Sequence, residues 1–334
     1  MRKYCLRLES LLTLQRKVYM SERCATYSLK VLFLMFSIVL GLFSVKSFAV
    51  EKVIYGPDDR LDIFEVSNPL FKNLAHSTAA MISTSSLQMN GERVSIVGKN
   101  LRGRGICGGE KFSEQLTAAS CSGFLVGKDL IVTAGHCART ARDCETNAWV
   151  FDYSVNSPDQ NVSTFDLPKS SVYRCKEIVE QVLDSGATDN DYALIRLERE
   201  VTDRAVLKVR TSGKIADKTE ILVIGHPTGL PVKIADNAAV RTNSDDYYFV
   251  ANLDTFGGNS GSAVFDSHTG QVEGILVRGE SDYEYDFSRG CKIPKVCKND
   301  ECRGEDVTRI TNVKKLMEIL RRSGESVTNT NDSK

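Results

Sequence analysis

The stretch Gly257-Gly258-Asn259-Ser260-Gly261-Ser262 places a serine between glycines, and strand-like sequence flanks it on both sides. Glycines beside a serine let the backbone adopt conformations that a Cβ atom would forbid, so that successive N–H groups can turn toward one point. Donors that converge in this way can stabilise a negatively charged oxygen. The stretch therefore makes Ser260 a candidate nucleophile.

A serine hydroxyl reacts slowly until a base takes its proton, so the interpretation requires a histidine and a carboxylate elsewhere in the chain. His136 lies in Thr133-Ala134-Gly135-His136-Cys137, directly after an apolar run, and Asp191 opens the apolar run 192–197. Asp191 is favoured over Asp189 and Asp184, because only Asp191 directly precedes a strand that can anchor it with its carboxylate turned inward. In that position it would fix the tautomer of the histidine.

The order His136, Asp191, Ser260, with these local motifs, resembles the chymotrypsin-like (trypsin-fold) serine peptidases over about residues 53–322. The resemblance implies an all-β fold of two six-stranded antiparallel barrels, with His136 and Asp191 in the first and Ser260 in the second. It also implies an oxyanion hole built from the backbone N–H groups of Gly258 and Ser260, and a disulfide between Cys121 and Cys137 beneath the histidine.

A Gly-x-Ser-x-Gly motif also fits the nucleophile elbow of α/β-hydrolases. Those enzymes carry the acid and the histidine after the serine, whereas only His268 follows Ser260 here, in a segment typical of a hairpin turn. This alternative is therefore disfavoured. His268, His76 and His226 are interpreted as structural residues.

Short β-type runs separated by turn residues begin near residue 75, as an all-β barrel protein requires. We expect the first barrel at about residues 70–200 and the second at about 205–310. Apolar residues then recur at helical spacing (Val313, Leu316, Met317 and Leu320), which predicts a C-terminal α-helix at about 312–322. The polar segment 323–334 is expected to be disordered.

The chain begins with features of a secretory signal over residues 1–49. Residues 31–44 are apolar, Lys30 precedes them, and Ser47-Phe48-Ala49 follows as a small-x-small cleavage pattern. A retained membrane anchor is the alternative, but the apolar run is shorter than the ~20 residues that span a bilayer. Translation from Met20 would give a signal of ordinary length.

The mature chain is expected to start at Val50 or, if residues 50–52 are a short pro-segment, at Val53. The string from Val53 to Arg60 resembles the mature start of bacterial glutamyl-endopeptidase-like members of the family. Asn259 stands where pancreatic-type members carry the aspartate that pairs with their new N-terminus. That activation switch is therefore expected to be absent.

Ten cysteines occur, and eight remain when Cys5 and Cys24 of the leader are set aside. An even number in an exported chain indicates disulfides rather than metal ligands. The resemblance pairs only Cys121 with Cys137. The partners of the other six are open, namely Cys107, Cys144, Cys175, Cys291, Cys297 and Cys302.

Formal charge is zero overall, but residues 1–49 hold eight Lys/Arg and two Glu, which leaves 35 basic and 41 acidic residues beyond them. This acidic excess gives no electrostatic basis for binding nucleic acid. No metal or organic cofactor is expected. The expected partner is a peptide or protein substrate, and the protein is expected to be a monomer, secreted to the extracellular space or the periplasm, without a stable membrane anchor.

The motifs together predict a serine endopeptidase that works through an acyl-enzyme. Two other functions are compatible with the same sequence. One is a binding or toxin module on the peptidase fold without turnover, although such proteins commonly lose a catalytic residue. The other is an esterase that uses the same site.

Substrate preference is expected to depend on a pocket lined by Asp254, Thr255 and Arg278. Asp254 lies six residues before Ser260, where trypsin carries the carboxylate at the base of its pocket, and this favours cleavage after Lys or Arg. Pairing between Asp254 and Arg278 would neutralise the pocket, because a buried charge without a partner is costly. Glutamyl endopeptidases carry a histidine where Leu276 stands, so a preference for glutamate is doubtful, and acidic and apolar preferences stay open.

Overall fold

The computed structural model describes residues 53–331. The predicted signal peptide, the alternative start at Met20 and the possible pro-segment 50–52 all lie outside the described residues. Among the residues described, no helix is long and apolar enough to cross a bilayer.

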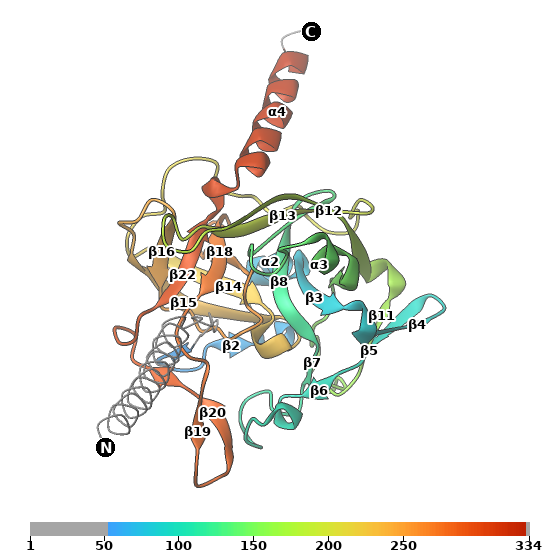
Figure 1. Ribbon diagram of the computed structural model, residues 1–334, viewed down its shortest axis with the longest axis vertical. Coiled ribbons are helices and arrows are strands. Elements are labelled where there is room, and N and C mark those ends of the chain that lie inside the picture. Colours follow the sequence, from blue (N-terminus) through green and yellow to red (C-terminus); the bar gives the residue numbers. More distant parts are fainter. Residues whose placement is uncertain (1–52, 332–334) are drawn as a thin grey trace, which may run out of the picture. The chain divides into compact units, whose positions relative to one another are not determined.

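Six antiparallel strands close the first barrel in the order β10-β12-β13-β9-β8-β3. Figure 1 labels four of them, β3, β8, β12 and β13. Their bounds are β3 (Thr78–Ser83), β8 (Ala119–Gly127), β9 (Leu130–Thr133), β10 (Asn147–Val150), β12 (Val172–Leu183) and β13 (Asp191–Leu197). Strand β9 is buried along its whole length, and β13 nearly so. A strand buried on both faces is written as a continuous apolar run, which is the pattern that flanks His136 and Asp191.

The second barrel contains six further antiparallel strands, and a pairing between β14 and β15 closes it. Its strands are β14 (Glu220–Gly225), β15 (Lys233–Thr242), β16 (Tyr248–Ala251), β17 (Ala263–Asp266), β18 (Val272–Arg278) and β22 (Glu305–Arg309). The short strand β2 (Arg60–Leu61) adds to the edge of β15. The predicted all-β fold of two six-stranded barrels is thus confirmed.

Smaller sheets connect and extend the barrels. They comprise β4 (Leu87–Asn90), β5 (Arg93–Ile96) and β11 (Phe165–Pro168); β6 (Lys99–Asn100) with β7 (Leu116–Thr117); β19 (Tyr283–Asp286) with β20 (Cys291–Pro294); and β1 (Ile54–Tyr55) with β21 (Val296–Cys297). The pair β1–β21 is parallel and joins the first described residues to the segment that precedes β22.

Three α-helices occur in the described residues: α2 (Pro69–His76), α3 (Ala141–Thr146) and α4 (Lys314–Asn331). Helix α4 follows β22 as predicted, and it runs to Asn331, past the expected end at about residue 322. The expected disorder of the segment 323–334 stays a prediction. The apolar spacing that set the predicted end stops at Leu320. A helix can continue past its apolar stripe, because each further residue adds a backbone hydrogen bond once the first turns exist.

One apolar cluster joins the two barrels. It contains Phe124 and Ile131 from the first barrel and Leu222 and Phe265 from the second, all fully buried or nearly so. The hydrophobic effect of burying these side chains is the main favourable free-energy contribution that holds the two barrels together. It fixes the relative position of β8, β9 and the segment around Ser260.

Candidate active site

The pair His136 and Asp191 is held by two hydrogen bonds to one carboxylate. The His136 Nδ1 atom lies 2.7 Å from Asp191 Oδ2, and the His136 backbone N–H donates to Oδ1 at 3.0 Å. Asp191 is 2% exposed and the His136 side chain 14%. An ionised carboxylate accepts only, so Nδ1 carries the proton and Nε2 is left as the acceptor. This is the tautomer that a general base requires.

Strand pairing explains why these two residues meet. Residue 193 of β13 lies opposite Thr133 of β9, so the end of β9 and the start of β13 are neighbours. Gly135 lies between Thr133 and His136, and a Cβ atom there would be 2.0 Å from the carbonyl oxygen of Val182 on β12. The glycine therefore allows the β12–β13 hairpin to approach the backbone that carries the imidazole.

Ser260 is attached through its backbone to the strand that supports His136. Its carbonyl oxygen accepts the Ser122 N–H at 2.8 Å and lies 3.8 Å from Cys137 Sγ. The next residue, Gly261, donates its N–H to Leu276 of β18 at 2.8 Å. Because Cys137 directly follows His136, these contacts bring the serine to the junction of the barrels where the His136–Asp191 pair lies.

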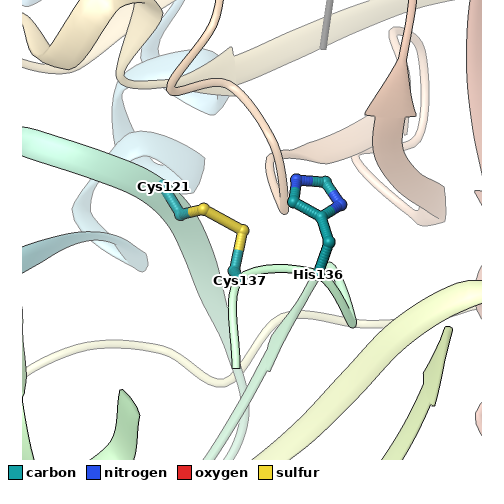
Figure 2. A group of neighbouring side chains, drawn as sticks. All are labelled: Cys121, His136 and Cys137. Carbon is teal, nitrogen blue, oxygen red and sulfur yellow. A yellow bond between two sulfur atoms is a disulfide. The ribbon is translucent and has the colours of Figure 1, made fainter. Parts of the chain in front are cut away.

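The disulfide expected between Cys121 and Cys137 is present, and Figure 2 shows it beside the His136 ring. The ligand-type atoms of Cys121, His136 and Cys137 all lie within 4.8 Å of one another. Such a cluster could suggest a metal site, but thiolates are the species that bind metal, and these two sulfurs are bonded to each other. The group is therefore a covalent support for the histidine.

The remaining cysteines pair as Cys107–Cys291, Cys144–Cys175 and Cys297–Cys302, which gives four disulfides in the described part of the chain. Sequence spacing left these pairings open. Cys107–Cys291 spans 184 positions, and no local pattern could have indicated it.

The backbone N–H groups of Gly258 and Ser260 donate no hydrogen bond within residues 53–331. Gly258 has a φ of +96°, and a Cβ atom on it would lie 2.5 Å from the carbonyl oxygen of His226. Both the conformation and the close approach require glycine here. Two donors without an internal acceptor, one on each side of Asn259, are what an oxyanion hole needs.

Asp254 differs from the expectation of a carboxylate at the base of a substrate pocket. Its Oδ1 accepts the Tyr55 N–H at 2.6 Å, and its Oδ2 accepts the Asp59 N–H at 2.9 Å. Burial raises the pKa of Asp254 to about 7, against the effect of these two donors. Asp254 therefore anchors the N-terminal segment Val53–Leu61 to the loop that precedes Ser260.

Arg278 pairs with Asp306 and not with Asp254, so the alternative in which Arg278 neutralises Asp254 is not the one found. Arg278 Nε pairs with Asp306 Oδ2 at 3.2 Å, and its NH2 group donates to the carbonyl oxygen of Asp189 at 3.0 Å. Strand register accounts for this, since Arg278 lies opposite Asp306 in the β18–β22 pair. Sequence analysis placed Arg278 in the expected pocket but could not identify the residue that lies opposite to it in the sheet.

Thr255 contacts a carboxylate that sequence analysis missed. Its Oγ1 donates to Glu305 Oε2 at 2.7 Å, and both residues are fully buried. Glu305 opens β22, but Gly304-Glu305-Asp306 has the composition of a polar loop, so no apolar alternation indicated a buried strand. A second carboxylate, Asp282, accepts the Gly257 N–H at 2.8 Å.

The other histidines lie outside this group. His226 is buried, stacks on Tyr153 and donates its Nδ1–H to the carbonyl oxygen of Leu230 at 3.0 Å. Burial lowers its pKa to about 3, so it stays neutral. His76 is exposed, and His268 is exposed beside Glu220. Asp184 and Asp189, the rejected candidates for the acid, bond within their own loop.

Comparisons with known proteins agree with this geometry. Residues 121–275 match the family model of the trypsin-like peptidase domain. A curated relative, the glutamyl endopeptidase of Bacillus licheniformis, is 26% identical over 189 residues, which are 53% of this chain and 56% of that protein. The match thus spans about half the length of the relative.

Among solved structures, a Glu endopeptidase in complex with MPD aligns with 81% of this chain and 100% of its own, at 17% identity and a TM-score of 0.48. The family match, placed on the two closed barrels described above, confirms the predicted resemblance. Residues 121–275 therefore match a trypsin-like peptidase domain, and this match together with the two barrels supports a chymotrypsin/trypsin-like serine peptidase.

Proposed function

We propose that this protein is a secreted serine endopeptidase in which Ser260, His136 and Asp191 form the catalytic triad. One observation carries the proposal. Asp191, 2% exposed, accepts hydrogen bonds from both the ring and the backbone of His136. A buried carboxylate that fixes one histidine tautomer has a clear use when that histidine must take a proton from a serine.

In the proposed reaction, Ser260 Oγ attacks the carbonyl carbon of the scissile peptide bond while His136 Nε2 takes its proton. The oxygen of the tetrahedral intermediate faces the N–H groups of Gly258 and Ser260. His136 then gives its proton to the leaving amine, and an acyl-enzyme forms. Water, activated by the same histidine, releases the acid product and restores Ser260.

Several features support an exported enzyme that works alone. Disulfides persist in oxidising compartments, and four occur in the described residues. All residues of the proposed site come from one chain, so a monomer is sufficient. The chemistry needs no cofactor, since the base, the nucleophile and the oxyanion donors are protein groups.

The proposed substrate preference is still cleavage after Lys or Arg, but with Glu305 instead of Asp254 as the selecting carboxylate. Glu305 and Asp282 both bond to the loop that leads to Ser260, at Thr255 and Gly257. Two carboxylates beside this loop oppose an acidic substrate side chain and attract a basic one.

A fluorophosphonate probe tests the proposal, because it reacts with activated serine nucleophiles. We expect the mature protein to gain the mass of the phosphonyl group on Ser260 and to cleave a diverse peptide library, with cleavage sites identified by mass spectrometry. Hydrolysis of esters without any peptide cleavage would favour an esterase. Peptide binding without labelling or turnover would favour a binding module.

A further inference from the structure

The short loop η5 (Pro227–Gly229) lies directly against the glycines that precede Ser260. The backbone N–H of Thr228 donates to the carbonyl oxygen of Gly257, and Ser122 Oγ donates to the carbonyl oxygen of Gly258 at 2.8 Å. The Ser122 hydroxyl is itself held by the N–H of His226, at 2.9 Å. Both carbonyl groups beside the proposed oxyanion hole therefore have fixed directions.

The bond to Gly257 also sets the direction of the next N–H. In a trans peptide the C=O and N–H groups point to opposite sides. Because the Gly257 carbonyl points toward Thr228, the Gly258 N–H points away from η5. A flipped peptide would direct the carbonyl oxygen of Gly257 to the place where a substrate oxyanion must be stabilised.

Thr228 adopts an unusual conformation to make this bond. Its φ is 51° and its ψ is 22°, in the left-handed region that a β-branched residue rarely occupies. Such strain persists only where the surrounding structure enforces it, and it is frequent at functional sites. Here the Thr228 Oγ1 atom lies 2.6 Å from the hydroxyl oxygen of Tyr283, within a hydrogen bond.

Tyr283 is well placed to enforce that conformation. It opens strand β19, its ring lies 4.9 Å from the ring of Phe256, and the partner strand β20 is tied by Cys291 to Cys107. Burial raises the pKa of Tyr283 to about 12, so the hydroxyl keeps its proton at neutral pH. The hairpin, the Thr228 side chain and the Gly257 carbonyl thus form one connected set of contacts.

We propose that Tyr283 and Thr228 are positioning residues that hold the Gly257–Gly258 peptide with its N–H directed at the oxyanion. This inference rests on the proposed function, because the peptide matters only if Ser260 attacks a carbonyl group. Neither side chain touches the reacting atoms. Both act through the orientation of a donor that is used most strongly in the transition state.

The test compares Tyr283→Phe, which removes only the hydroxyl, with Tyr285→Phe, which removes an exposed hydroxyl from the same hairpin. We would measure kcat and KM on a peptide substrate, and the affinity for a peptide aldehyde, which forms a tetrahedral adduct with the serine. For Tyr283→Phe we expect about a tenfold lower kcat and about a tenfold weaker aldehyde complex, with KM little changed. Tyr285→Phe should match the wild type.

Thr228→Val keeps the shape of the side chain but removes its hydroxyl, and we expect the same losses. Thr228→Gly tolerates the left-handed φ without support from Tyr283, so it should retain more activity than Thr228→Val. Adding Tyr283→Phe to Thr228→Gly should then have little further effect, because the two residues act through one contact.

A Tyr283→Phe variant with the kcat and aldehyde affinity of the wild type would overturn this inference and leave the proposed function intact. The same holds if only KM changes. A wild-type protein that neither cleaves peptides nor reacts at Ser260 would instead overturn the proposed function, and the inference with it.

Discussion

The guanidinium of Arg60 lies over the ring of Phe256, 4.2 Å from the ring centroid, and thereby joins the N-terminal segment to the loop that leads to Ser260. Arg60 is 2% exposed and also forms a two-point ion pair with Asp58. We expect Arg60→Met to lower the free energy of unfolding by about 2 to 3 kcal/mol, because it leaves Asp58 without its partner and removes the stacking contact.

Urea denaturation checks this prediction, with Arg93→Met as the control. Arg93 forms an ion pair with Asp166 that is about half exposed, and such pairs contribute roughly 0–1 kcal/mol. Equal stability losses in the two variants would show that the buried Arg60 contacts contribute no more to the free energy of unfolding than an exposed ion pair does.

Removal of the Ser260 hydroxyl should lower catalytic turnover without lowering the stability of the fold. Ser260→Ala is expected to lower turnover by about 10⁴ to 10⁶. The unfolding midpoint should not change, because within residues 53–331 the Ser260 hydroxyl makes no hydrogen bond that supports the fold. Ser267→Ala, in the partly exposed turn after β17, is the control. Substantial turnover by a correctly folded Ser260→Ala protein would remove Ser260 from the mechanism.

Asp254 should make stability depend on pH in a definite direction. Its pKa is about 7 in the folded protein and near 4 in the unfolded chain, so the native state holds the proton more tightly. The stability that this group contributes is fully present below pH 4 and is lost as pH rises through 7.

We therefore expect the free energy of unfolding of the wild type to fall by up to about 4 kcal/mol between pH 4 and pH 8 because of this group. Asp254→Asn should abolish that fall. The measurement is the difference in free energy of unfolding between wild type and variant across this range. A difference that does not change with pH would show that Asp254 is ionised throughout, with a pKa kept low by the N–H groups of Tyr55 and Asp59.

Glu305 should control selectivity between basic and apolar substrates. We expect Glu305→Gln to lower kcat/KM for a substrate with Arg before the cleaved bond by about tenfold, since the buried negative charge that attracts the basic side chain from behind the loop is lost. A matched Leu substrate should change only a fewfold, because the Gln side chain still accepts the hydrogen bond from Thr255. Equal losses on both substrates, or strict cleavage after Glu by the wild type, would reject Glu305 as the selecting group.

The family resemblance, together with local sequence, predicted the His136–Asp191 pair. Each residue stands at the end of an apolar run, and pairing of those two runs brings the side chains together. The contacts of Asp254 and Arg278 could not be predicted in this way. Asp254 bonds to a backbone group 199 positions away, and the partner of Arg278 depends on a strand register that includes a bulge. Backbone donors leave no mark on the sequence, because every residue type except proline supplies one.

The attachment of the N-terminal segment also has a consequence for the order of folding. Strand β1 leaves the ribosome first among the described elements, yet its partner β21 lies at Val296–Cys297, near the end of the chain. Closing so long a loop costs entropy that is repaid only when both ends are present. Residues up to Cys297 must therefore be synthesised before β1 can pair with β21. A nascent or truncated chain that lacks the last strands would hold Ser260 in an unsupported loop. Peptidase activity should therefore appear only after the chain has folded completely.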